Sequence, residues 1–156
     1  PSRAVQAAPE LLLADLARFA EQQQPAAHEL LLIGRRHVRS NNSWMHNYHR
    51  LVKGKPRHQL LMNPADLARR GLSDGQRVQV RSRVGSIEVE VAASDEVMAG
   101  VVSLPHGWGH ARPGVQMDIA RAQPGASAND LTDERHLDAV SGNAALNGVP
   151  VRVEAA

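Results

Sequence analysis

The side chains best suited to binding a ligand are concentrated in one polar segment, residues 36–47, RHVRSNNSWMHN. The segment follows a short apolar run and shows neither helical nor strand periodicity. Polar loops that follow buried strands are frequent ligand sites, and guanidinium groups bind anions through charge-assisted hydrogen bonds. The segment is therefore a candidate anion-binding loop.

The charge around this loop is one-sided, although the whole chain carries a formal net charge of only +2. No Asp or Glu occurs from Leu30 to Ala65. The same stretch holds Arg35, Arg36, Arg39, Arg50, Lys53, Lys55 and Arg57, together with His37, His46, His49 and His58. Such an excess repels itself unless it is solvated or faces an anion. Nucleic acid, an acidic lipid and a phosphate-bearing small ligand all fit. Codon bias explains Arg in place of Lys, but it does not explain the missing acids.

Composition narrows the chemistry further. With 156 residues the chain has the length of one domain, and 42% apolar residues are enough for a packed core. Aromatic residues make up only 3%, so that core must be aliphatic. The absence of Cys excludes disulfides, Cys-ligated metal sites and thiol catalysis within this chain. No apolar run is long enough to predict a membrane span.

Other candidate groups each have a structural alternative. His106 and His110 have the spacing of a helical metal pair, but Gly107 and Gly109 between them disfavour a helix. Hydrogen bonding to a ligand, or plain surface exposure, is the favoured interpretation of both histidines. Gly85-Ser86 is interpreted as a hairpin turn, although self-cleaving pyruvoyl enzymes on small barrels use the same dipeptide.

For two further sets of residues, the sequence leaves open whether the role is structural or ligand binding. Trp44 and Trp108 lie in Asn- or Gly-rich segments, where they either pack within the loops or stack on a planar ring system. Residues 129–147 are rich in Asn and Asp, which suits turns and helix caps. The same carboxamides also suit the edge of a heterocycle, because Asn supplies both donors and an acceptor.

The elements that must position these groups are mostly short strands. Apolar runs and period-two alternation predict strands at residues 30–35, 59–62, 76–83, 87–91, 100–105 and 149–153. Helices are predicted at 9–22, with Leu12, Leu16 and Phe19 on one face, and at 63–71, with an Asn cap and a terminal Gly. Residues 111–147 show little pattern beyond one turn of helix near 115–121. Strands without regular helical crossovers favour a small barrel with interleaved loops.

Six short motifs follow one another in a distinctive order. They are Gly34-Arg35 before the polar loop, Asn63-Pro64-x-Asp66, Gly71-x-x-Asp74-Gly75-x-x-Val78-x-Val80-x-Ser82-x-x-Gly85, Gly100-Val101-Val102, Asn129-x-Leu131-Thr132 and Asp138-x-x-Ser141-Gly142. Each is weak by itself. In this order, over residues 28–154, they resemble the C-terminal molybdopterin-dinucleotide-binding domain of the molybdopterin oxidoreductases, the group that contains DMSO reductase, formate dehydrogenase and periplasmic nitrate reductase.

The resemblance implies a mainly β fold, a double-psi β-barrel of about six strands with an N-terminal helix and short interleaved helices. Residues 1–27 would be a lead-in helix and linker, and residues 28–156 the barrel domain of a larger parent chain. The domain would close over a bis(molybdopterin guanine dinucleotide) cofactor holding Mo or W. The N-terminal domains of the parent would be its partners and would hold most of that cofactor, together with any iron–sulfur cluster. The parent would be an oxidoreductase, whereas the fragment by itself would not turn over.

The resemblance also assigns candidate cofactor contacts in the polar loop, after the Gly-Val-Val strand and in the Asn-rich tail. They are Gly34, Arg35, Arg39, Ser40, Asn41, Asn42, Ser43, Trp44, Met45, His106, Gly107, Trp108, Asn129, Asn143 and Asn147. Relatives frequently carry a cofactor-contacting Lys where this chain has Asn147, so a cation is missing there. No residue is assigned a catalytic or metal-binding role.

A stand-alone basic barrel that binds nucleic acid is the alternative. Phosphate contacts would then dominate, and affinity would fall steeply with salt. The near-absence of Tyr and Phe disfavours this alternative, because single-stranded nucleic acids are held largely by aromatic stacking.

Overall fold

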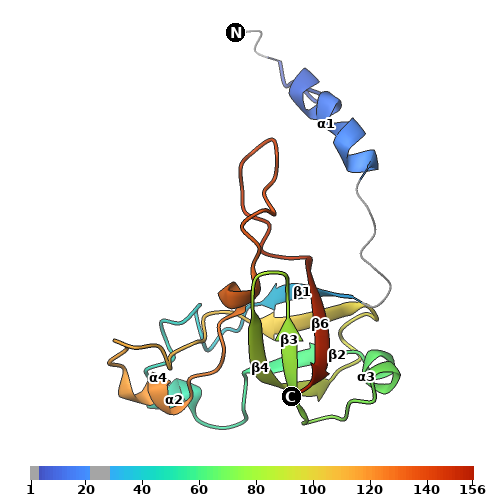
Figure 1. The fold of residues 1–156 in the computed structure, drawn as a ribbon. Helices are drawn as coiled ribbons and strands as arrows, with labels where there is room; N and C mark the ends of the chain where they lie inside the picture. The colour runs from blue at the N-terminus through green and yellow to red at the C-terminus, as the bar shows by residue number, and fades with distance from the viewer. Residues whose placement is uncertain (1–3, 22–28) are drawn as a thin grey trace.

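A computed structural model describes residues 4–21 and 29–156, and its centre is a closed barrel (Figure 1). The barrel order is β1-β5-β2-β4-β3-β6. The strands are β1 (Leu30–Arg35), β2 (Gln59–Met62), β3 (Arg77–Arg81), β4 (Ser86–Ala93), β5 (Val101–Pro105) and β6 (Val149–Ala155). Two pairs, β1–β5 and β2–β4, are parallel, and the other neighbours are antiparallel. Because each parallel pair joins strands that are not consecutive, the chain crosses over the barrel ends.

Short helices interrupt the strands. They are α1 (Glu10–Ala20), α2 (His49–Val52), α3 (Pro64–Arg70), α4 (Asp118–Ala122) and the 3-10 turn η1 (Ala128–Leu131). With six barrel strands and these helices, the predicted mainly β double-psi barrel is confirmed. No helix in residues 4–21 or 29–156 combines the length and the hydrophobicity that crossing a bilayer requires.

The core is aliphatic, as the composition predicts. On the β3–β4 hairpin, Val78 pairs with Val89 and Val80 with Ile87, and all four side chains are buried while their neighbours alternate outward. Leu131 of η1 completes the cluster and is fully buried. The barrel is therefore filled by branched aliphatic side chains, and η1 is fixed to it by packing.

The hairpin interpretation of Gly85-Ser86 is also confirmed. Ser82 donates its backbone N–H to the Gly85 carbonyl at 2.9 Å, which closes the turn. A Cβ on Gly85 would lie 2.3 Å from the Asp130 carbonyl oxygen, so the hairpin tip needs glycine in order to pack against η1.

Helix α3 carries the terminal signals that the sequence predicts. The side chain of Asn63 accepts a hydrogen bond from Ala65 N at 3.0 Å, and Gly71 adopts the left-handed conformation at φ 63°. The carboxylate of Asp66 is 1% exposed and does more than complement the helix dipole. It accepts the Gly100 N–H at 2.7 Å and pairs with Arg69 and Arg70, so it joins α3 to the start of β5.

Helix α1 is shorter than predicted and buries none of its residues within the described chain. Leu12, Leu16 and Phe19 are 51%, 58% and 68% exposed, so the expected apolar face has no cover there. The predicted helix end at residue 22 and the boundary between residues 27 and 28 lie outside the described residues.

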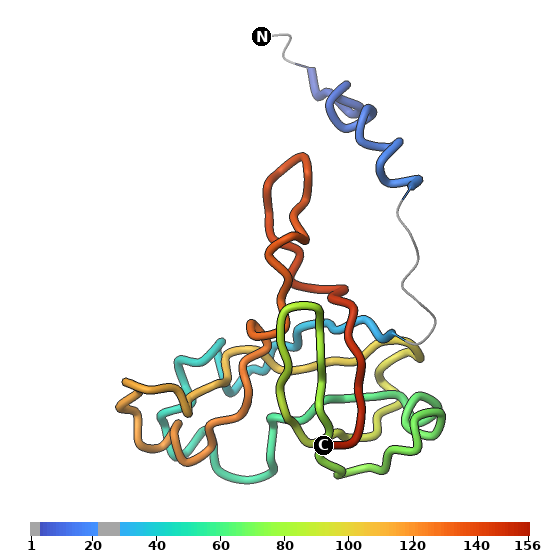
Figure 2. The backbone as a smooth tube through the Cα atoms, in the orientation of Figure 1, coloured from blue at the N-terminus to red at the C-terminus, as the bar shows by residue number. Residues whose placement is uncertain are grey.

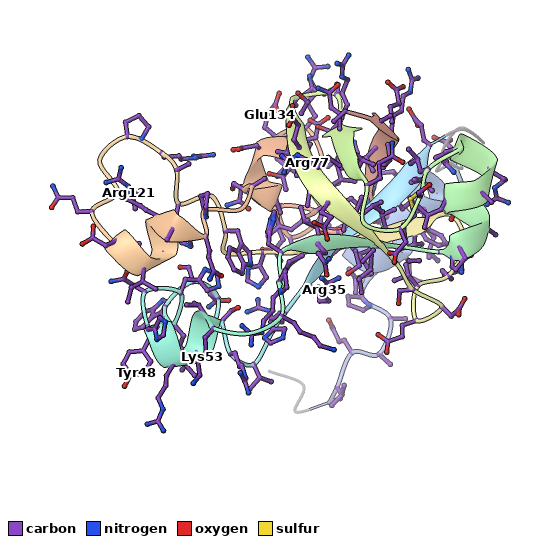
Figure 3. The ribbon with its side chains drawn as sticks, turned by 90° about the horizontal axis from the view of Figure 1, so that it is seen from below. Arg35, Tyr48, Lys53, Arg77, Arg121 and Glu134 are labelled. Carbon is purple, nitrogen blue, oxygen red and sulfur yellow. The ribbon has the colours of Figure 1, made fainter. Side chains whose placement is uncertain are left out.

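Two irregular regions extend from the barrel. The region 111–147 is largely irregular, as predicted, and its last part, residues 132–148, projects as a narrow loop (Figure 2). A bridge between Leu137 and Ala144 and a 2.8 Å bond from Asp138 N to the Asn143 carbonyl close this loop. Helices α2 and α4 lie together on one side of the barrel (Figures 1 and 3), where Asn47 Oδ1 accepts the Ile119 N–H at 3.1 Å.

Replacing the buried carboxylate tests the join between α3 and β5. Burial acts to raise the pKa of Asp66, but the Gly100 amide and Arg69 outweigh it, so the pKa lies below its ordinary value. We expect Asp66→Asn to lower the free energy of unfolding by about 2 kcal/mol, because hydrogen bonds to charge are lost. Because the pKa of Asp66 is lower in the folded chain than in the unfolded one, its carboxylate stabilises the fold at pH values above the unfolded pKa. This contribution is lost as pH falls through the folded pKa.

Urea unfolding at pH 7 and pH 3 measures both effects. The mutant and the wild type should differ less at pH 3 than at pH 7. Asp95→Asn, at an exposed position, is the matched control and should be neutral at both values. Equal stability of Asp66→Asn and wild type at pH 7 would contradict the assigned role.

Candidate functional site

A polar cavity lies where β1 and β5 end at the same edge of the barrel. The two strands run parallel, with Gly34 opposite Leu104 and Arg35 opposite Pro105, so the segments that follow them emerge side by side. The cavity has a volume of about 150 Å³, and we call it the β1 cavity. It is lined by Leu32, Ile33, Gly34, Arg36, His106, Ala128, Asn129, Thr132, Leu146 and Asn147.

Four of the predicted contacts meet in this cavity, although they come from distant parts of the sequence. Gly34 lies near the end of β1, His106 follows β5, Asn129 lies on η1, and Asn147 precedes β6. The Gly34 N–H donates to Asn147 Oδ1 at 2.7 Å, which orients the Asn147 amide. Thr132 Oγ1 donates to the Asn129 carbonyl at 2.9 Å and holds the end of η1. Carboxamides, an imidazole and a backbone turn thus surround one small space.

Arg36 also lines the β1 cavity, although the resemblance assigns it no contact. Its Nη1 donates to Asn42 Oδ1 at 2.7 Å, which directs the guanidinium along the polar loop. The signal that could have found it is its place in the acid-free stretch directly after the β1 strand. A guanidinium beside carboxamides is suited to a ligand that combines an anion with a heterocycle.

The polar loop is a series of tight turns built from its own backbone. Ser40 N donates to the His37 carbonyl at 2.9 Å, and Met45 N donates to the Ser40 carbonyl at 3.1 Å. Asn41 and Asn42 have positive φ values of 41° and 64°, a conformation that Asn tolerates better than most residues. Both asparagines therefore shape the loop, whatever they bind.

Gly107 sets how closely this loop approaches the segment after β5. Its φ is +89°, and a Cβ there would lie 2.3 Å from the Asn42 carbonyl oxygen and 3.1 Å from Ser43 N. Glycine is thus required twice, for backbone conformation and for space. The predicted residues Asn42, Ser43 and Gly107 are brought together.

Arg35 takes a different position from the rest of the predicted set. Its guanidinium points back toward the barrel edge (Figure 3) and donates to the Ser103 carbonyl at 3.0 Å and to the Gln59 carbonyl at 2.9 Å. Burial lowers the pKa of Arg35, but the group stays charged because Arg titrates far above neutrality. It ties β1, β5 and β2 together, and a cofactor contact for it stays a prediction.

Several other predicted contacts lie outside the β1 cavity. Trp44 is 84% exposed, Ser40 is buried, and Arg39 and Met45 lie in the same loop. Trp108 lines a separate cavity of about 440 Å³ with Arg57, His58 and other residues. No ring contact joins the two tryptophans among the described residues.

Asn143 lies on the projecting loop, away from the β1 cavity. It lines a wider hollow of about 1,140 Å³ between that loop and α1, and Asn147 lines both spaces. Its backbone carbonyl accepts from Asp138, so the residue has a turn-forming role here.

Sequence reasoning missed a set of buried imidazoles behind the loop. His46 Nδ1 and His110 Nε2 are 2.8 Å apart and both side chains are buried, while His58 is half-buried nearby. The abundance of His in the acid-free stretch was a signal for His46 and His58, whereas His110 was expected to bind a ligand or lie on the surface and is instead buried against His46. Within the described ranges, no three His, Asp or Glu side chains gather closely enough to hold a metal ion.

The structure thus has the form of a closed mixed barrel domain, with tight turns at one edge and a polar cavity there whose lining contains no carboxylate. Residues 30–150 match the model of the Molydopterin dinucleotide binding domain, and the chain belongs to this family. The resemblance drawn from the motif order is therefore confirmed.

Relatives place this domain within much larger proteins. A tetrathionate reductase chain of Salmonella typhimurium is 30% identical over 122 residues, which cover 67% of this chain and 12% of the relative. ArrA, the molybdopterin-containing chain of arsenate respiratory reductase from Chrysiogenes arsenatis, is 31% identical over 114 residues, covering 70% and 13%. Acetylene hydratase from Pelobacter acetylenicus superposes with a TM-score of 0.64 at 18% identity, covering 92% of this chain and 20% of that one, and so shares the fold.

Two glycines with almost the same backbone conformation test the contact between the loop and the segment after β5. Gly107 and Gly114 have φ values of +89° and +86°, but an added Cβ meets no atom within 4 Å at Gly114. We expect Gly114→Ala to cost about 1–2 kcal/mol from backbone strain. Gly107→Ala should cost about 2 kcal/mol more, because the Asn42 backbone must move.

Chemical denaturation gives the two stabilities, and amide NMR shifts of residues 40–46 report the displacement. Only Gly107→Ala should move those shifts. Equal losses of stability in the two variants, with unmoved loop resonances, would show that the contact is unimportant.

Proposed function

We propose that this chain binds molybdopterin guanine dinucleotide as the C-terminal domain of a Mo- or W-dependent oxidoreductase. The observation that carries the proposal is the meeting of Gly34, His106, Asn129 and Asn147 around one cavity, in a chain of the molybdopterin dinucleotide binding family. The chain spans roughly an eighth of the length of the curated relatives, which supports its origin in a larger protein.

The charge of the site suits a pyrophosphate-bearing ligand. No carboxylate lines the β1 cavity. Among the ion pairs within residues 4–21 and 29–156, none involves a cation between Arg35 and Arg57. Arg36 and Arg39, the two cations of the polar loop, therefore have no acid partner within the described ranges, and a bound phosphate would be their counter-charge.

The size of the cavity supports a shared site. At about 150 Å³ the β1 cavity is smaller than the roughly 300–1,000 Å³ of ordinary ligand pockets. A dinucleotide would thus cover this face and extend beyond it, with the remaining contacts made by the rest of the parent chain. The isolated domain should not catalyse turnover, because it offers one wall of the site.

The residues of this chain would act by binding and orienting. When bound, the cofactor supplies the metal and its redox chemistry. Arg36 and Arg39 would neutralise phosphate charge, and Asn129 and Asn147 would present fixed donors and acceptors to a heterocycle edge. His106 would form the wall next to Asn129, and the backbone amides of the polar loop would add donors that need no side chain.

Cofactor content of the protein expressed from the full reading frame tests the proposal. We expect Asn129→Ala and Arg36→Gln each to lower the bound molybdenum and pterin, because losing a hydrogen bond to a charged or fixed partner weakens binding about 10- to 100-fold. Arg50→Gln, on the exposed face of α2 and away from the β1 cavity, is the matched control.

Metal analysis and fluorescence of the oxidised pterin give the two contents per mole of folded protein. Full content in both site variants would contradict the proposed contacts, and so would an equal loss in Arg50→Gln. A protein from the full reading frame that contains no pterin would contradict the proposed function itself.

A further inference from the structure

An aromatic cluster of two buried and two half-buried side chains lies between the polar loop and the segment after β5. It consists of His46, His58, Trp108 and His110, and we call it the imidazole–indole cluster. The ring centroids of His46 and Trp108 are 4.1 Å apart, and those of His58 and Trp108 are 5.2 Å apart. His46 and His110 meet edge to face and share the 2.8 Å contact between Nδ1 and Nε2.

That contact constrains protonation. Of the two facing nitrogens one must donate and the other must accept, so at least one ring is neutral. His46 and His110 are only 2% and 6% exposed, and water cannot easily replace the bond. If both imidazoles were cationic, two N–H donors would face each other in a buried space.

The cluster is also under-satisfied. His46 Nε2 and Trp108 Nε1 are buried without a hydrogen-bond partner among the described residues. Buried unsatisfied groups cost free energy, and their presence in a folded protein calls for a reason other than stability. The Trp108 ring packs against the imidazoles, and this packing takes the place of the missing hydrogen bonds.

These rings connect three segments of the chain that lie around the β1 cavity. His46 lies near the end of the polar loop, and its backbone N–H donates to the Ser43 carbonyl at 3.1 Å. His110 N and Gly109 N both donate to the Pro124 carbonyl, at 3.0 and 2.8 Å. His58 Nε2 lies 2.9 Å from the Ala126 carbonyl, shortly before η1 with its Asn129. Movement in the cluster would therefore reach the segments that form the β1 cavity.

We propose that His46, Trp108 and His110 are positioning residues of the cofactor site. The His46–His110 pair holds the polar loop against the segment after β5 as long as at most one of the two rings is cationic. When both rings are cationic, the loop is released from that segment. The inference rests on the proposed function for the ligand, but the release itself is a property of this chain.

The electrostatic surroundings agree with this geometry. Burial, and then the charge of His110, lower the pKa of His46 to about 4, and the nearby His58 and His37 act in the same direction. Burial also lowers the pKa of His110 and of His58, with Arg35 adding to the effect at His58. Burial, and then Arg57, Arg35 and Arg39, lower the pKa of His37. The Gly107 backbone at His46 and the Ala126 backbone at His58 act in the opposite direction, but the net effect at both rings is a lowered pKa, which favours neutral rings in the closed loop.

The sign of the pH effect follows from that lowering. A released His46 titrates near its ordinary value of 6.5, whereas the closed one titrates at about 4. As pH falls from about 6.5 to about 4, the released state binds more protons and is favoured, and below about 4 the effect levels off. The population of the released loop should rise roughly 10- to 100-fold across this window.

Two substitutions at one position separate positioning from simple packing. His46→Asn keeps a hydrogen-bonding group near Nδ1 but cannot titrate, so the loop should stay closed from pH 8 to pH 4.5. His46→Leu fills the space without a bond, so the loop should be released already at pH 8. His49→Gln, on the exposed side of α2, is the control and should follow the wild type.

The readouts use the 156-residue chain and need no cofactor. In a Trp44→Phe background, Trp108 is the only tryptophan, and its emission wavelength and acrylamide quenching report its exposure. Hydrogen exchange of the amides of residues 40–46, corrected for intrinsic rates, reports the loop. Far-UV circular dichroism checks that the barrel remains folded at each pH.

The wild type should show a longer emission wavelength, stronger quenching and faster loop exchange as pH falls below 6.5, with the barrel intact. His46→Asn should lose this response, and His46→Leu should show the released values throughout. A wild type unchanged from pH 8 to 4.5 would overturn the inference, as would His46→Leu with closed-loop values at pH 8. A normal pH response in a full-length protein without pterin would instead overturn the proposed function and leave this inference standing.

Discussion

The parallel pairing of β1 with β5 is the constraint on which the site depends. Parallel neighbours end at the same barrel edge, so the polar loop after Arg35 and the segment after Pro105 start beside one another. The Arg35 guanidinium secures this edge by bonding carbonyls of β5 and β2. The close approach at Gly107 and the wall made by His106 both depend on this pairing. The two strands are about seventy residues apart in sequence, and their hydrogen bonds in register bring the segments that follow them side by side.

The chain separates its charges by function. Acids at two structural junctions are paired with arginines: Asp66 with Arg69 and Arg70, and Asp133 with Arg83. The cations near the site lack such partners among the described residues and are held instead by carbonyl or carboxamide oxygens, as for Arg35 and Arg36. A guanidinium bonded to a neutral acceptor keeps its full charge, so this arrangement maintains a positive field where an anion would bind.

Local patterns in the sequence were enough to predict most of the fold. The bounds of β1 and β2 and the caps of α3 were predicted correctly, because they depend on apolar runs and on Asn, Pro and Gly at fixed positions. The apolar face of α1 was also predicted, but its cover could not be, since nothing in residues 4–21 and 29–156 buries it. For the candidate site, motif order nominated Asn129, and Asn147 was nominated where relatives frequently carry Lys; both line the β1 cavity, and their cofactor contacts stay predictions. The cluster around His46 could not be foreseen, because a side chain's burial depends on long-range packing that leaves no local period.

The position of β6 in the ring has a consequence for how the molecule is made. Residues 149–155 lie between β1 and β3, and they pair with both. Until β6 is made, the first five strands therefore have two edges whose backbone N–H and C=O groups lack a neighbouring strand. Such edges can pair with other chains. Closure joins segments far apart in sequence, a slow step by topology. Closure of the ring is thus a late step in folding, and until then the two open strand edges are where the chain is exposed to aggregation.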